Sequence, residues 1–485
     1  MTRIGVAFAL AACLLATNAN AQAPGAPAPL ASPVAAPPDA LAAAIDKSAT
    51  ALVGSGHVPG VAIAVERHGR VTFARGYGFA DAARKMPVTV DTRFEIGSIT
   101  KQITAACVLQ LVEAGKLSLD EHLGTYVSDY FIGRGVTIRQ LLAHTSGIPE
   151  YLDGPDVVAS AGSQPATYAT ILARVSAQPL DFPPGTRWKY SNTNYVLLGR
   201  VIELASHEPY ERYVREHVFA PAGMTESGFI DDEKALPEMA GGFVVTPKGS
   251  APAPPLRADW VAATGSVVST VGDVLKWDDA LLAGKIVARE DVALMRSPAK
   301  LANGTATAYG FGWVIDSLDG HGRVWHNGAT FGYYALNATF PHDDESIVVL
   351  ANAAPPGVEN LARDAFAALH DDVAPANATL TPAPGEDPAV TARVREMLRQ
   401  FQTGDVDRSA LNATALKSMT PDVLAGARDT LASLGSPQAL IFRGKSPAGD
   451  ATAYAYRAQF ASTTLAIVMT LDATGKIAGY RIFPP

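Results

Sequence analysis

The sequence predicts an α+β fold: one antiparallel sheet flanked by helices, followed by a small C-terminal α+β accessory domain. Three observations support it. Residues 61–78 alternate apolar and other side chains around His68-Gly69, as a β-hairpin does. A helical middle follows, and alternating segments return between residues 323 and 351. Strands at both ends of one segment, with helices between them, indicate a sheet assembled from both ends of a domain.

The elements of this body follow in order along the chain. Residues 61–67 and 71–78 form the two strands of the hairpin. Residues 94–114 have the length and apolar content of a long, mostly buried helix, which Gly115 ends. Residues 137–144 form a short amphipathic helix. Three late strands complete the sheet, at 323–325, 333–340 and 346–351.

A Pro-rich break at 374–388 separates this body from a tail. A helix begins at Pro388, carries an apolar face and ends at Gly404. Four alternating segments then form a meander, at 439–442, 453–460, 465–471 and 476–483. Helices followed by a curved antiparallel sheet resemble small cystatin-like or NTF2-like accessory domains. The tail has no catalytic constellation, so we expect it to cover the body, dimerise or hold a ligand.

The first residues have the pattern of a secretory signal peptide. Arg3 is positively charged, residues 4–16 are apolar, and Ala19-Asn20-Ala21 is a small-x-small cleavage site. Such a segment is too short to remain as a transmembrane anchor. The run that ends at Cys13 resembles a bacterial lipoprotein cleavage box, but only about nine apolar residues would precede that cut, so lipidation is the less favoured alternative. The sequence therefore predicts a periplasmic or secreted protein.

Composition excludes several classes of protein. Of 485 residues, 48% are hydrophobic, which excludes wholesale disorder and a collagen-like repeat. The formal net charge is −8 and no long basic run occurs, which argues against nucleic acid or an anionic membrane as the main partner. Two cysteines build no disulfide framework, and Cys107 is expected to be buried and inert. The expected organisation is a signal peptide at 1–21, a Pro/Ala-rich tether at 22–40, a body at 41–373, a linker at 374–388 and an accessory domain at 389–485.

Ser98-Ile99-Thr100-Lys101, at the start of the long predicted helix, is the first candidate catalytic motif. The i to i+3 spacing places Ser98 and Lys101 on one helix face, where their side chains can touch. A serine hydroxyl needs an adjacent base to become a nucleophile, and a desolvated lysine with a lowered pKa supplies one. The alternative signatures G-x-S-x-G and H-E-x-x-H are absent from the sequence. The motif therefore favours a lysine-assisted serine nucleophile, with no metal or cofactor.

Two later motifs accompany it, Tyr190-Ser191-Asn192 and His326-Asn327-Gly328. With residues 94–101 they resemble the three sequential motifs of the penicillin-recognising serine hydrolases, whose set is S-x-x-K, S-D-N and K-T-G. The middle element is Tyr-x-Asn, as in class C β-lactamases and the serine DD-peptidases and esterases grouped with them. The resemblance covers about residues 45–370, with further matching segments at 141–149, 309–313 and 326–332.

The resemblance implies a β-lactamase-like fold with a helical subdomain, and an acyl-enzyme mechanism. Ser98 would attack a carbonyl carbon, while Lys101 and Tyr190 share the proton transfers. Asn192 would hold the substrate amide or the Lys101 side chain. The backbone N–H groups of Ser98 and Ala329 would form the oxyanion hole, with Gly328 in the same substrate-binding strand. By contrast, residues 144–147 are expected to be a structural turn.

The third motif departs from K-T-G, because His326 replaces the lysine whose cation helps to hold a substrate carboxylate. An ordinary histidine is mostly neutral at pH 7. The sequence therefore predicts an exported serine hydrolase of small esters, or of D-amino-acid amides and peptides, with weak or no β-lactamase activity. Two alternatives remain open: a penicillin-binding or sensor-like protein that acylates slowly and works through a partner, and a true class C-like β-lactamase. The sequence carries no signal for any particular oligomeric state.

Overall fold

The computed structural model describes residues 38–81, 85–128, 133–153, 157–232, 238–246, 249–355, 357–376, 382–419, 424, 427–428, 431–448, 451–460 and 464–483. The expected signal peptide lies outside the described residues, as does the expected tether before residue 38. Two compact units divide the chain between Pro355 and Pro356, and each is described by itself. Across the ranges given above, no helix is both long enough and apolar enough to span a membrane.

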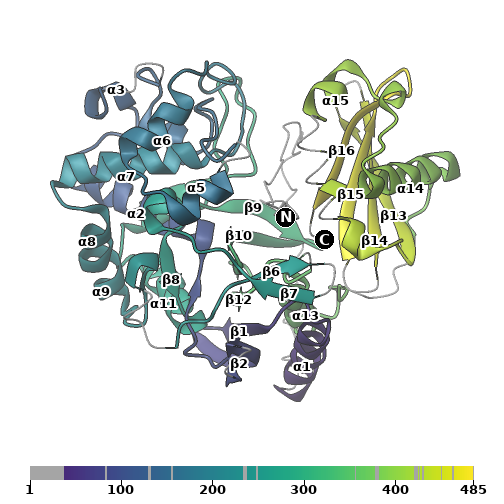
Figure 1. Cartoon of the computed structure of the whole chain (residues 1–485), viewed down its shortest axis with the longest axis horizontal. Helices are drawn as coiled ribbons and strands as arrows, with labels where there is room; N and C mark the ends of the chain where they lie inside the picture. Colours follow the sequence, from purple (N-terminus) through teal and green to yellow (C-terminus); the bar gives the residue numbers. More distant parts are fainter. Residues whose placement is uncertain are drawn as a thin grey trace. The chain divides into compact units, whose positions relative to one another are not determined.

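The first unit is built on an antiparallel sheet that joins the two ends of the unit (Figure 1). Strand β1 pairs with β12 in the register Val61 to Ala351 and Arg67 to Glu345. The paired strands therefore come from the beginning and the end of the sequence of this unit. In the described chain the strand order is β3-β2-β1-β12-β11-β10-β9. The bounds are β1 Gly60–Arg67, β2 Arg70–Asp81, β3 Met86–Pro87, β9 Val314–Leu318, β10 His321–Thr330, β11 Tyr333–Phe340 and β12 Glu345–Ala351. The prediction of one sheet assembled from both ends is confirmed.

The centre of this sheet is buried on both faces. Every residue of β11 and β12 is buried, and β1 is buried except for its last residue, half-buried Arg67. Helix α1 (Pro38–Gly54) lies on one side of the sheet, and α2 (Thr100–Glu113) and α11 (Val271–Leu282) lie on the other (Figure 1). Strands covered on both faces lose the alternation of a half-exposed strand, which explains the nearly continuous apolar runs here.

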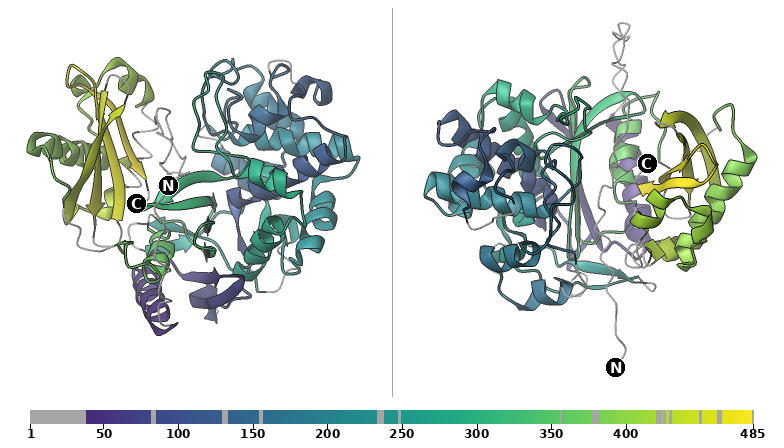
Figure 2. Two further views of the ribbon diagram at one scale, coloured as in Figure 1. Left: turned by 180° about the vertical axis from the view of Figure 1, so that it is seen from behind. Right: turned by 90° about the horizontal axis from the view of Figure 1, so that it is seen from above.

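The chain between β3 and β9 forms the helical subdomain that Figure 2 shows beside the sheet. Its other helices are α3 Leu123–Tyr126, α4 Ile138–Leu142, α5 Val157–Ser163, α6 Tyr168–Val175, α7 Asn192–Ser206, α8 Tyr210–Val214, α9 Ala220–Ala222, α10 Ala258–Gly265 and α12 Arg289–Met295. A small sheet in the order β4-β8-β5 joins Phe94–Glu95, Val267–Ser269 and Gly228–Phe229, and β6 Phe243–Thr246 pairs with β7 Gly249–Pro252. The fold is α+β, as predicted.

The long helix predicted at 94–114 is interrupted at its start. Phe94–Glu95 is strand β4, paired with β8, and a short 3-10 helix at Gly97–Ile99 precedes α2. Gly97 has a φ of +50°, which a residue with a Cβ adopts rarely. The strand pairing and the left-handed glycine therefore make a sharp turn, and the helix begins at Thr100.

The second unit contains a four-stranded antiparallel meander, with β13 Ala439–Ala448, β14 Ala451–Gln459, β15 Thr464–Leu471 and β16 Ile477–Phe483. Helix α14 (Pro388–Thr403) begins at the Asp387 cap and ends at Gly404, as predicted. Its apolar face packs into the core of this unit through Val390, Val394, Met397, Leu398 and Phe401. Helices α13 (Asn360–Ala367) and α15 (Ala413–Ser418) also belong to this unit. The predicted small C-terminal α+β domain is present.

Candidate active site

The turn before α2 presents Ser98 at a half-buried position. A Cβ built on Gly97 would lie 2.7 Å from the backbone nitrogen of Ala329, closer than real Cβ contacts. A Cβ on Gly328 would lie 1.9 Å from the carbonyl oxygen of Ile96 and 2.8 Å from the nitrogen of Ser98. The two glycines therefore let strand β10 approach the turn at backbone contact distance. This approach places the backbone nitrogens of Ser98 and Ala329 close to the same contact between strand and turn.

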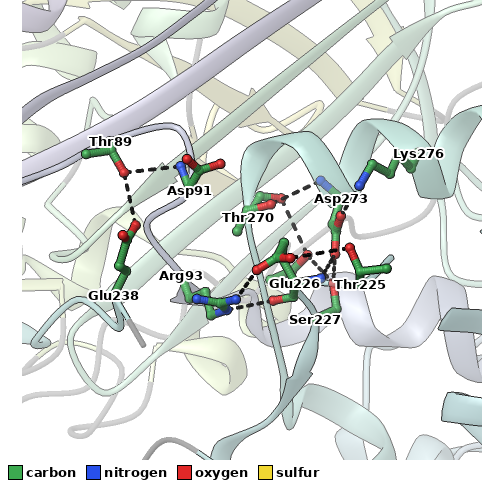
Figure 3. Close-up of polar contacts among 11 residues, drawn as sticks. Thr89, Asp91, Arg93, Thr225, Glu226, Ser227, Glu238, Thr270, Asp273 and Lys276 are labelled. Carbon is green, nitrogen blue, oxygen red and sulfur yellow. Dashed lines mark hydrogen bonds and ion pairs between the residues drawn. The ribbon is translucent and has the colours of Figure 1, made fainter. Parts of the chain in front are cut away.

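A polar network anchors the chain just before this turn (Figure 3). Arg93, which directly precedes β4, donates from Nε to the carbonyl oxygen of Glu226 at 2.9 Å and forms an ion pair with the Glu226 carboxylate. Asp273, fully buried in the first turn of α11, accepts from the Glu226 nitrogen at 2.7 Å and from Ser227 Oγ at 2.9 Å. Lys276 Nζ donates to its other oxygen at 2.8 Å. The network ties β4, and so the nucleophile turn, to α11.

Lys101 lies one helical turn after Ser98 and is 0% exposed. Its Nζ lies 2.9 Å from Ser98 Oγ, 2.8 Å from Asn192 Oδ1 and 2.9 Å from the carbonyl oxygen of Thr264. Burial lowers the pKa of Lys101 to about 7, and the nearby Glu150 carboxylate partly opposes that change. A lysine with this pKa is substantially neutral near pH 7, which is the state that a general base requires.

Tyr190 is the second side chain that forms a hydrogen bond with Ser98, in addition to Lys101. Its Oη donates to Ser98 Oγ at 2.9 Å, and Lys101 Nζ lies 5.0 Å from the centre of its ring. Asn192 begins α7, and Tyr190 lies two residues earlier, just outside the helix, with Ser191 in an extended conformation between them. The structure therefore brings Ser98, Lys101, Tyr190 and Asn192 together, as the motif spacing predicts.

His326 on β10 is buried, with 3% of its surface exposed. Its Nε2 lies 3.0 Å from Tyr309 Oη, and its Nδ1 faces the carbonyl oxygen of Asn327. A carbonyl only accepts, so Nδ1 carries the proton and Nε2 accepts from the tyrosine hydroxyl. Burial, with the Lys101 cation, lowers the pKa of His326 to about 3. The third motif therefore presents a neutral imidazole at neutral pH.

Two groups beside the site were not predicted from the sequence. His144 is buried, and its ring centre lies 4.3 Å from that of Tyr190 and 4.9 Å from that of Tyr309. Its Nδ1 accepts from the Ser191 nitrogen at 3.2 Å and lies 3.1 Å from Asn194 Nδ2. The predicted structural turn at 144–147 thus also supports the tyrosine of the second motif. The second group is Glu150, whose contacts with Asn192 are described below.

Cys107 is buried in α2, as predicted, and burial raises the pKa of its thiol. A thiol in this environment stays protonated and out of contact with solvent, which fits an inert side chain.

Comparison with known proteins identifies the family. The family model described as Beta-lactamase matches residues 45–372. The chain belongs to the beta-lactamase family. With the relatives and solved structures given below, this match confirms the predicted relationship to the penicillin-recognising serine hydrolases and the predicted enzyme class.

Individual relatives agree with this assignment. A penicillin-binding protein of Bacillus subtilis (strain 168) is 30% identical over 300 residues, which cover 59% of this chain and 66% of the relative. Protein flp of Staphylococcus aureus (strain N315) is 28% identical over 317 residues, 64% of this chain and 62% of that relative. The match to these curated relatives thus spans just under two thirds of their length.

Solved structures show the same fold. The D-amino acid amidase from Ochrobactrum anthropi SV3, complexed with L-phenylalanine amide, is 25% identical with a TM-score of 0.61, over 69% of this chain and 99% of that chain. The octameric penicillin-binding protein homologue from Pyrococcus abyssi is 24% identical with a TM-score of 0.61, over 92% of this chain and 95% of that chain. The second likeness concerns the fold alone.

Proposed function

We propose that this protein is an exported hydrolase that forms an acyl-enzyme on Ser98 and acts on small esters or on D-amino-acid amides and peptides. The observation that carries the proposal is the position of Ser98 Oγ, which lies 2.9 Å from both Lys101 Nζ and Tyr190 Oη. One neighbour is a buried amine with a pKa of about 7, and the other is a hydroxyl that donates to Oγ. This is the arrangement of an activated nucleophile between a base and a proton donor.

The steps follow from this geometry. Ser98 Oγ bonds to the substrate carbonyl carbon while its proton passes to the neutral Lys101 amine. The oxyanion forms beside the N–H groups of Ser98 and Ala329, which stabilise it. The C–O or C–N bond to the leaving group then breaks, and Tyr190 passes a proton to that group, replaced by one from Lys101. Water attacks the acyl-enzyme by the reverse proton path and releases the acid.

The neutral state of His326 supports a substrate without a carboxylate beside the nucleophile. A β-lactam or a peptide C-terminus carries a carboxylate that a cation in the third motif would hold, and a buried imidazole with a pKa of about 3 provides none. The likeness to a D-amino acid amidase, crystallised with an amino-acid amide, supports the same class of substrate. We therefore expect weak or no β-lactamase activity.

One substrate panel tests the proposal. It contains short p-nitrophenyl esters, a D-alanyl anilide and a chromogenic cephalosporin, each assayed with the wild type and with Ser98→Ala. We expect ester or anilide turnover that falls by at least about 1,000-fold in Ser98→Ala, because the covalent step is lost. Ester turnover that survives in Ser98→Ala would overturn the mechanism, and cephalosporin turnover above that of the esters would indicate a true β-lactamase.

A second candidate is a penicillin-binding or sensor-like protein that acylates slowly and works through a partner. The names of relatives favour it, since one of them is a penicillin-binding protein of Bacillus subtilis. Stoichiometric β-lactam acylation of Ser98, without turnover of any substrate in the panel, would support this alternative and exclude the first proposal. Mass spectrometry of the intact protein measures that acylation directly.

A further inference from the structure

Glu150 is a half-buried residue that no catalytic motif includes, yet its carboxylate binds both the backbone and the side chain of Asn192. Its Oε2 accepts from the backbone nitrogen of Asn192 at 2.7 Å and from the side-chain Nδ2 of Asn192 at 2.9 Å. Its Oε1 accepts from the nitrogen of Leu152 at 3.0 Å, which fixes the carboxylate plane. A carboxylate is an acceptor only, so the amide group of Asn192 must turn its NH₂ toward Glu150.

The Asn192 oxygen then faces Lys101, with Oδ1 2.8 Å from Nζ. The Thr264 carbonyl oxygen lies 2.9 Å from the same nitrogen. Both oxygens only accept hydrogen bonds, and a neutral amine has two N–H groups and one lone pair. Two obligate acceptors use both N–H groups, so the lone pair is left for the third neighbour, Ser98 Oγ at 2.9 Å. A reversed Asn192 amide would place two donors face to face and remove this order.

We propose that Glu150 is a positioning residue, which holds the Asn192 amide in the orientation that aims the Lys101 lone pair at the Ser98 hydroxyl. The inference rests on the proposed acyl-enzyme function and adds a residue 42 positions before Asn192 to its machinery. Glu150 itself touches neither the nucleophile nor the base through any hydrogen bond described above. Its orienting effect on Lys101 therefore passes through Asn192, while its charge acts on Lys101 directly.

The charge of Glu150 gives a separate readout. Its carboxylate raises the pKa of Lys101 against the larger effect of burial, so removing the charge lowers that pKa further. If neutral Lys101 is the base, the acid limb of the pH profile of kcat/KM moves to lower pH. The other titratable or charged groups described around this pair are Tyr151 and Asp153 on the same loop, Arg174 on α6, His144, Tyr190, Tyr195 on α7 and His326 on β10.

The experiment compares Glu150→Gln, Asn192→Ala, the double variant and Ser98→Ala on the best ester of the panel, from pH 5 to 9. Asp153→Asn is the matched control, because it removes the same charge from the same loop at an exposed side chain. We expect Glu150→Gln and Asn192→Ala each to lower kcat/KM by about 10- to 100-fold, as loss of a partner that orients a reactive group does. The double variant should lose no more than Asn192→Ala alone, and Asp153→Asn should stay within about twofold of the wild type.

The acid limb should move to lower pH in Glu150→Gln, while Asp153→Asn keeps the wild-type limb to within about 0.3 pH units. Thermal unfolding of each variant shows whether it is folded. Multiplicative losses in the double variant, or a Glu150→Gln enzyme with wild-type kcat/KM and acid limb, would overturn the inference. Ester turnover that survives in Ser98→Ala would instead overturn the proposed function, so the two failures are distinguishable.

Discussion

Replacing Gly328 by alanine tests the contact between strand β10 and the nucleophile turn. Gly328 has no positive φ, so an alanine there meets no backbone strain. Its Cβ would lie 1.9 Å from the Ile96 carbonyl oxygen and 2.8 Å from the Ser98 nitrogen. Both atoms belong to backbone and cannot rotate away as a flexible side chain would. The strand or the turn must therefore move.

The magnitude follows from these distances. Ordinary Cβ contacts begin at 3.4 Å, so the strand has to withdraw by about 1.5 Å from Ile96. Donors of an oxyanion hole work at about 2.7–3.1 Å, and loss of one donor costs about 100- to 1,000-fold in kcat. A withdrawal of that size moves the Ala329 N–H beyond this distance from the oxyanion. We expect kcat to fall by about 100-fold or more, with a loss of about 1–3 kcal/mol in stability.

Gly322→Ala on the same strand is the matched control. Its Cβ would meet only His342 Cδ2, at 3.6 Å, which is an ordinary contact. Steady-state turnover of a p-nitrophenyl ester and thermal unfolding are measured for both variants, and Gly322→Ala should keep kcat within about twofold. A Gly328→Ala enzyme with more than about a third of wild-type kcat would refute the reasoning, because the oxyanion hole would then not depend on this approach.

Three further predictions concern titration and buried charge. Because Lys101 must be neutral to act as the base, kcat/KM should rise through an apparent pKa of about 7, and a profile that is flat from pH 5 to 9 would contradict this. Asp273→Asn should lower the free energy of unfolding by about 3 kcal/mol in a denaturant titration, since the buried carboxylate accepts from three groups, including Lys276; an unchanged midpoint would contradict it. Burial raises the pKa of Asp278 to about 7, above its unfolded value of about 3.9, so the stability that protonated Asp278 contributes is lost as pH rises from about 4 through 7. Urea unfolding at pH 4.5 and 8 measures this: the difference in the free energy of unfolding between the two pH values should be smaller in Asp278→Asn than in the wild type. An equal difference in both proteins would count against the prediction.

Much of the fold could be predicted because its strands have simple patterns. The alternation around His68-Gly69 locates β1 and β2, and the late apolar runs locate β11 and β12. The break at Gly97 could not be predicted, because residues 94–114 contain no proline and only one glycine, and a single glycine is a weak signal inside a helical pattern. Strand β9 (Val314–Leu318) was missed for the opposite reason. It lies at the edge of the sheet, and the sequence Val-Ile-Asp-Ser-Leu has the polar centre of a loop.

The residues of the candidate site likewise include some that the sequence predicted and some that it did not. Ser98 lies in the 3-10 turn that leads directly into α2, and Lys101 lies in the first turn of α2. Tyr190 and Asn192 flank the start of α7, so local spacing is enough to pair the residues within each motif. Glu150 and His144 were missed because their partners lie more than 40 positions away in the sequence. No periodicity links such residues. The signal that could have pointed to them is the segment 141–149, which matches the family and immediately precedes Glu150.

The charges around Ser98 affect both the protonation state of Lys101 and the kind of substrate that the site accepts. His326 is neutral because burial and Lys101 both disfavour its cation, while Tyr309 and Asn327 occupy its two nitrogens. A lysine at that position would hold a substrate carboxylate, but its permanent charge would lower the pKa of Lys101 further. With the imidazole neutral, burial and Glu150 set the protonation of Lys101. Once Lys101 is neutral and ready to act, a substrate carboxylate beside Ser98 would meet no cation from the third motif. Histidine in place of lysine at position 326 therefore keeps the pKa of Lys101 near 7 and favours substrates without a carboxylate beside Ser98.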